Sequence, residues 1–194
     1  MPRLAGMEGG AELDASDLLS EAQKEGVLGR EPSALRLRAD PWDVYTRSVS
    51  SEYWEQAHPG ACVSQWSLRG SRIVRRLRYT VDTDVRFGPS RSDIVEVQEL
   101  QHTPGALFER WSTVMPQASW GISFHIHVHI RASLDAEDGS VRIEHRMRPV
   151  VLRGVWGLKT MLHREAKRQC SNGFERWCNW VGESRDAEAT ITPD

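Results

Sequence analysis

WGLKTMLHREAKRQCSNGFERWCNWV, residues Trp156 to Val181, is the stretch that decides the fold. Its apolar and small residues recur every three or four positions, which predicts one long amphipathic helix. At 1.5 Å per residue the helix is roughly 39 Å long, enough to cover a whole sheet. The residues of this stripe are Leu158, Leu162, Ala166, Cys170, Gly173, Phe174, Trp177 and Val181.

The segments before this helix have a different period. Apolar and polar residues alternate in five runs, which is typical of strands with one buried face. Thr103-Pro104-Gly105 and Ala136-Glu137-Asp138-Gly139 are turn signals that predict hairpins, and Phe87-Gly88-Pro89-Ser90 breaks the first run. The predicted strands are 72–82, 93–101, 107–115, FHIHVHI at 124–130, and 140–151.

A short strand and two short helices precede these runs. Leu35–Arg38 is the strand candidate, and Asp40-Pro41 then provides an N-cap followed by proline at the first helical position. A second helical piece is expected around Tyr53-Trp54. The order of elements predicts an α+β fold, in which a curved antiparallel sheet wraps around the C-terminal helix. If the sheet curves strongly, an apolar cavity is left between the two layers.

Length and composition fit one ordered domain. Residues 1–33 and 183–194 are expected to be a disordered lead and tail around a domain at 34–182. The chain has 194 residues with 25 basic and 27 acidic side chains, so its charge gives no argument for a nucleic-acid partner. Three widely spaced cysteines and no signal-like apolar run favour a reduced, cytoplasmic setting.

Several blocks in this order resemble the VASt domain of the StART-like helix-grip superfamily, which occurs beside GRAM domains in sterol transporters. The arginine-rich strand 75–81 ending in Tyr79-Thr80-Val81, the Phe87-Gly88-Pro89 turn and the strand 95–100 match the start of that family's pattern. Gly121-Ile122-Ser123-Phe124 resembles its Gly-x-Ser-Phe block. Trp156 with Lys159, Leu162 and Ala166 is similar to its entry into the last helix. The resemblance covers about 35–181.

The resemblance implies a helix-grip fold and a lipid-binding function. The chain is then expected to hold a sterol or other lipid in the cavity and to carry it between membranes. Transient contact with anionic membrane surfaces, a peripheral location at membranes or membrane contact sites, and an anchoring protein partner are also implied. No cofactor is expected.

The expected cavity wall follows from the alternation of each strand and the helix stripe. Glu109 and His145, together with Glu99, occupy positions shared with apolar residues, where each either binds a ligand hydroxyl or is turned to solvent. The expected ligand-binding residues are Leu77, Tyr79, Val95, Val97, Glu109, Trp111, Phe124, Ile126, Val128, Ile143, His145, Met147, Leu162, Ala166 and Cys170.

The three histidines of FHIHVHI raise the question of a metal site. His125, His127 and His129 share one face of the strand, opposite its apolar side, so they are expected to point outward. No cysteine or carboxylate at ligand spacing accompanies them, and no native metal site is expected. The arginines of 69–78 and the basic residues of 159–168 are expected to be solvated faces that attract anionic headgroups locally.

Two other functions remain open from the sequence. A cavity-less interaction module of the same fold has its inner residues packed as a core, with Gly173 allowing helix and sheet to approach closely. An enzyme of the cyclase or hydrolase kind uses Glu109 and His145 in acid–base chemistry. No nucleophile–base–orienter set is evident, so binding is favoured over catalysis.

Overall fold

The computed structural model describes residues 33–70, 72–82, 90–117, 123–153 and 158–183. The expected lead up to residue 32, most of the tail, the turn at 87–89 and Trp156 lie outside this range. The elements are β1 Ser33–Leu37, α2 Pro41–Val49, α3 Glu52–Ala57, β2 Cys62–Val63, β3 Ser67–Arg69, β4 Arg72–Asp82, β5 Arg91–Gln101, β6 Phe108–Pro116, β7 Ser123–Leu134, β8 Val141–Arg153 and α4 Leu158–Gly182.

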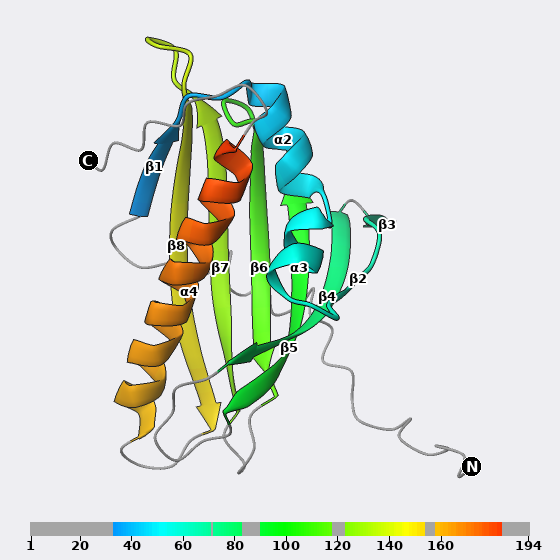
Figure 1. Cartoon of the computed structure of the whole chain (residues 1–194), viewed down its shortest axis with the longest axis vertical. Helices are drawn as coiled ribbons and strands as arrows, with labels where there is room; N and C mark the ends of the chain where they lie inside the picture. Colours follow the sequence, from blue (N-terminus) through cyan, green and yellow to red (C-terminus); the bar gives the residue numbers. More distant parts are fainter. Residues whose placement is uncertain (1–32, 71, 83–89, 118–122, 154–157, 184–194) are drawn as a thin grey trace.

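The strands form one antiparallel sheet in the order β1-β8-β7-β6-β5-β4-β2, with β3 also paired to β4. The β5–β6 and β7–β8 turns carry glycines in the left-handed region, Gly105 at φ 76° and Gly139 at φ 72°. Figure 1 shows α4 running lengthwise across one face of the curved sheet, with α2 and α3 on the same face. This arrangement confirms the expected α+β helix-grip fold.

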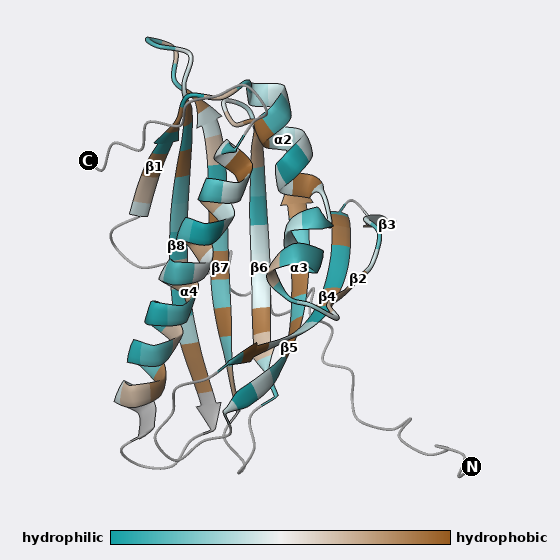
Figure 2. Cartoon of the chain, viewed as in Figure 1, coloured by the Kyte–Doolittle hydropathy of each residue, from teal (hydrophilic) through white to brown (hydrophobic). Residues whose placement is uncertain are grey.

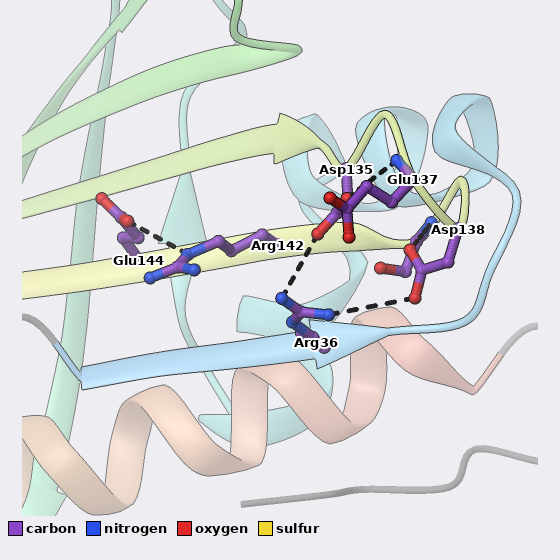
Figure 3. Close-up of polar contacts among 7 residues, drawn as sticks. Arg36, Asp135, Glu137, Asp138, Arg142 and Glu144 are labelled. Carbon is purple, nitrogen blue, oxygen red and sulfur yellow. Dashed lines mark hydrogen bonds and ion pairs between the residues drawn. The ribbon is translucent and has the colours of Figure 1, made fainter. Parts of the chain in front are cut away.

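Side-chain contacts define the start of α2 and attach the β7–β8 turn to the sheet edge. The Asp40 side chain accepts hydrogen bonds from the backbone N–H groups of Trp42 and Asp43 at 2.9 and 3.2 Å, and Pro41 opens α2, as expected. Arg36 of β1 lies 3.3 Å from the Asp135 carboxylate and 3.9 Å from that of Asp138 (Figure 3). These contacts join the β7–β8 turn to the edge strand.

The register defines which residues share the face under the helices, here called the inner face. Leu77 pairs with Glu96, Glu96 with Val114, and Val114 with Ile126 across β4 to β7. The neighbouring positions of each strand point to the opposite, outer face. His145 of β8 stacks on Phe174 of α4 at 4.4 Å between ring centroids, which places α4 on the inner face.

The packed core lies under the part of α4 from Phe174 onward. Strand residues Ala132, Val141 and Ile143 are fully buried there, together with Cys178 and Val181 of α4. An added Cβ at Gly182 would lie 3.2 Å from the Cδ2 atom of Leu37, so helix and sheet are in tight contact at this end. Brown strand segments lie behind α4 in Figure 2, while teal segments face the viewer on the helix. The stripe of the C-terminal sequence therefore packs on the sheet as predicted.

Among the described residues, no helix has the length and apolar character needed to cross a bilayer.

Candidate functional site

The inner face next to the N-terminal half of α4 is the part of the fold that is incompletely covered. Phe124 pairs with Val151 and Val128 with Met147, and all four side chains remain half-buried. Ile126 and Pro149 lie between these pairs and are buried. The apolar surface is therefore continuous along β7 and β8, but α4 does not seal it as it seals the other end.

Gly173, a half-buried residue of α4, has open space where a side chain would lie. This residue belongs to the inward stripe of α4, between Cys170 and Trp177. A Cβ atom built on Gly173 meets no atom within 4 Å, whereas the same atom at Gly182 is in tight contact. The close helix–sheet approach expected at Gly173 for a cavity-less module is therefore absent, and this residue instead contacts α3, where the Tyr53 hydroxyl donates to its carbonyl at 3.2 Å.

Eleven of the predicted wall residues lie on the inner side. The strand residues occupy the same face of β4, β7 and β8 as Leu77 and Ile130, according to the register. The helix residues belong to the stripe of α4 that also contains Phe174. Ala166 is buried, while Leu162 and Cys170 are half-buried. These residues are Leu77, Tyr79, Phe124, Ile126, Val128, Ile143, His145, Met147, Leu162, Ala166 and Cys170.

The predicted inward orientation of four residues on β5 and β6 is wrong. Val95 and Val97 pair with outer residues of β4, and Trp111 pairs with His129. Glu109 also lies on the outer face, with its carboxylate 3.5 Å from the His129 ring and 3.6 Å from Arg131. Val97 packs instead in a small outer cluster with Val74, Trp111 and Met115. Glu99, considered for the same role, is likewise on the outer face, 3.2 Å from Arg72.

The inner positions of these two strands carry a polar cluster that the sequence analysis missed. The Tyr79 hydroxyl donates to Oε2 of Glu96 at 2.8 Å, and Nε2 of Gln98 donates to Oε1 at 2.6 Å. Oε1 of Gln98 in turn accepts from Nε of Arg75 at 2.7 Å. Arg110 completes the cluster on β6. The members of this polar cluster alternate with apolar residues of the outer face. Alternation alone therefore predicts that the polar side of β5 and β6 faces outward.

The two arginines meet the end of α2. Nη1 of Arg75 donates to the carbonyls of Val49 and Ser50 at 2.9 and 3.0 Å, and Nη1 of Arg110 donates to the carbonyl of Ser48 at 3.4 Å. Each guanidinium also stacks on an indole, Arg75 on Trp66 at 4.3 Å and Arg110 on Trp177 at 4.7 Å. The expectation that Arg75 belongs to a solvated face is wrong.

Burial sets the protonation of the groups near this cluster. It lowers the pKa of Arg75 to about 9, so that the guanidinium stays charged at neutral pH. It lowers the pKa of His145 to about 4, with the Arg110 charge as the next cause, so this imidazole is neutral. It also raises the pKa of the Cys170 thiol to about 12. His145 and Cys170 therefore present uncharged side chains to the inner face.

The histidine row lies on the outer face, as expected. His127 contacts the Thr113 hydroxyl through Nδ1 at 3.3 Å, and the rings of His125 and His127 lie 4.5 Å apart. Trp111 stacks on His129 at 4.0 Å. Within the described parts of the chain, no group of three or more His, Cys, Asp or Glu side chains is arranged to hold a metal ion.

Comparison with a solved structure agrees with this fold. The structure is similar to a conserved protein from Geobacillus kaustophilus, with a TM-score of 0.52 and 12% identity over 82% of this chain and 97% of that chain. Lower TM-scores relate it to TTHA0849 from Thermus thermophilus (0.49, 12% identity, 78% and 93% coverage) and to Ara h 8.0201 (0.47, 13% identity, 79% and 97% coverage).

At 12% identity the likeness to the protein from Geobacillus kaustophilus shows the fold alone. No protein-family model matches the sequence, and no curated protein matches it either. Fold and site together define an α+β helix-grip protein whose inner face is packed at one end and open beside α4 at the other. This architecture is consistent with a ligand-binding module.

Proposed function

We propose that this chain binds an amphipathic lipid, with a sterol as the leading candidate, between the sheet and the part of α4 that precedes Phe174. The space at Gly173 is the observation that carries this proposal, because a close-packed core leaves no room for an extra Cβ. Each 100 Å² of apolar ligand surface removed from water contributes about 2.5 kcal/mol to binding. The half-buried Phe124, Val128, Met147 and Val151 provide the matching surface.

The division of the inner face supports a ligand with one polar end. The apolar residues of β7 and β8 suit the body of a lipid, and the cluster around Glu96 and Arg110 suits a polar head. Ligand sites are commonly apolar with a few polar groups that fix orientation. The sterol itself, its transfer between membranes and contact with anionic membranes or an anchoring protein rest on the sequence resemblance to VASt domains.

Binding is favoured over catalysis because the carboxylate of the inner face, Glu96, is already hydrogen-bonded to other side chains. Both oxygens of Glu96 accept hydrogen bonds from protein side chains. Glu109, the carboxylate expected to serve in an enzyme, lies on the other side of the sheet from His145. These two groups therefore do not form the acid–base pair that a cyclase or hydrolase mechanism was expected to use.

A fluorescent-sterol titration with a matched pair of variants tests the proposal. Gly173→Leu fills the free space from the inward stripe of α4, and Asn172→Leu adds the same side chain on the exposed face of that helix. We expect saturable binding to the wild-type protein that unlabelled sterol competes away. Gly173→Leu should weaken it at least tenfold, while Asn172→Leu should bind as the wild type does.

Two outcomes contradict the proposal. One is the absence of saturable binding to the wild-type protein. The other is equal affinity in both variants, each with a wild-type circular dichroism spectrum.

A further inference from the structure

The polar cluster of the inner face has more positive charge than its own carboxylate neutralises. Among the described strand residues of this face, Arg75 and Arg110 are the basic side chains and Glu96 is the acidic one. All three are almost fully buried, with exposed fractions of 2%, 4% and 3%. Two guanidinium groups against one carboxylate leave an excess of one positive charge away from water, which is costly without a counterion.

Glu96 does not pair directly with either arginine. Its two oxygens are taken by Tyr79 and Gln98. Burial lowers the pKa of Arg75, and the charge of the nearby Arg110 lowers it further. Carbonyls at the C-terminal end of α2 offset part of the charge, since this end of a helix carries a partial negative charge. The guanidinium groups of Arg75 and Arg110 still repel each other beside these carbonyls.

Unsatisfied donors belong to these two arginines and to the end of α2 that both contact. Nη2 of Arg75, Nε of Arg110 and Oγ of Ser48 are buried and have no hydrogen-bond partner. Ser48 belongs to the end of α2 that both arginines contact. The indoles of Trp66 and Trp177 cover guanidinium faces, which leaves N–H edges as the groups free to bind a planar anion. Three donors and one uncompensated charge match a single carboxylate.

We propose that this cluster, here called the arginine cluster (Arg75, Arg110 and Ser48), recognises the carboxylate head of a monocarboxylic lipid, so that the chain prefers a lipid acid to the corresponding alcohol. The inference rests on the proposed lipid binding and changes the preferred head group, so that a lipid acid binds better than an alcohol such as a sterol. The head group meets N–H and O–H donors in a dry site, where charge-assisted hydrogen bonds are strong. The apolar tail lies toward β7 and β8.

Oleate and oleyl alcohol differ only in the head group and therefore test the preference. Each is titrated as a competitor of the fluorescent lipid at neutral pH, below its aggregation concentration. We expect oleate to bind the wild-type protein at least tenfold more tightly than the alcohol. Arg110→Gln should remove that difference by weakening oleate binding at least tenfold more than it weakens alcohol binding.

Two further variants keep the test decisive. Arg78→Gln makes the same change on the outer face of β4 and should retain the preference. Arg110→Lys keeps the charge and should retain part of it, even if Arg110→Gln does not fold.

Equal affinity of the wild-type protein for both competitors overturns the inference and leaves the proposed lipid binding intact. An acid preference that survives Arg110→Gln in folded protein also overturns it. Failure of the wild-type protein to bind the fluorescent lipid, oleate or the alcohol overturns the proposed function itself.

Discussion

Glu96 illustrates how a buried carboxylate is held on the inner face. It accepts one hydrogen bond at each oxygen, from Tyr79 at 2.8 Å and from Gln98 at 2.6 Å. Hydrogen bonds to a charged group contribute more than those between neutral groups, and losing one leaves part of the desolvation cost uncompensated.

Tyr79→Phe should therefore lower the free energy of unfolding by about 1–3 kcal/mol. Tyr45→Phe is the control, because the Tyr45 hydroxyl makes only a 3.5 Å exposed contact with His102. Loss of the Tyr45 hydroxyl should lower the free energy of unfolding by less than about 0.5 kcal/mol. Urea denaturation of both variants measures the difference, and similar values for the two would show that Glu96 does not depend on this donor.

Two buried histidines make stability depend on pH. Burial lowers the pKa of His127 and of His145 to about 4, from the ordinary value of 6.5. Between these pH values the unfolded chain binds more protons than the folded one, so acid favours unfolding. Their contribution is complete above pH 6.5 and is lost as the pH falls toward 4.

We expect the free energy of unfolding to fall by about 1–2 kcal/mol per histidine between pH 7.5 and 5. Urea titrations across this range measure the slope above the pH at which most carboxylates titrate. His127→Asn should flatten the slope, while His163→Asn on the exposed face of α4 serves as the control. A wild-type stability that rises on acidification would have the wrong sign for this explanation.

Residue alternation predicted the inner face of β4, β7 and β8 but inverted it on β5 and β6. Val95, Val97 and Trp111 are apolar yet lie outside, while Glu96, Gln98 and Arg110 are polar and lie inside. A polar network whose members satisfy one another in three dimensions has no signature in a single strand. The pairing of Leu77 with Glu96 supplies the missing information, and pairing is a tertiary property.

At the scale of single elements, α2 is set by its first residues. The Asp40 carboxylate accepts from two backbone N–H groups that have no partner within the helix. Asp40→Ala should lower the free energy of unfolding by about 1 kcal/mol, whereas Asp40→Asn should cost less because asparagine also caps helices well. Thermal melts distinguish the two, and equal losses would show that the cap itself is not the stabilising feature.

The two glycines of α4 should respond oppositely to alanine. Gly173→Ala adds a Cβ in free space and should stabilise the protein by about 0.5–1 kcal/mol through helix propensity. Gly182→Ala brings the Cβ to 3.2 Å from the buried Leu37 side chain, so overpacking should destabilise by about 1 kcal/mol. Denaturant unfolding measures both, and destabilisation by Gly173→Ala would contradict the space beside α4.

Long periodic elements were predictable from the sequence, and short ones were not. The strand expected at 72–82 is β4 itself, and the long C-terminal helix is α4. The two-residue β2 and the three-residue β3 were missed, because segments of this length contain less than two alternation periods. Pairing with β4 defines them.

At the scale of the whole molecule, the central feature is the unequal separation of α4 from the sheet. Helix and sheet are in tight contact at Gly182 and leave room at Gly173. The sequence predicted both layers and the possibility of a cavity. It did not predict where the free space lies, since this depends on sheet curvature and on the polar cluster beneath the helix.

The most direct measurement is methyl NMR of methionine-labelled protein during lipid titration. Met147 lies on the inner face of β8, paired with Val128, and Met115 lies in the outer cluster with Val97 and Trp111. We expect saturable shifts of the Met147 methyl signal on addition of sterol or oleate, with the Met115 signal unchanged. A shift confined to Met115, or no saturable shift at Met147, would contradict a lipid site between the sheet and α4.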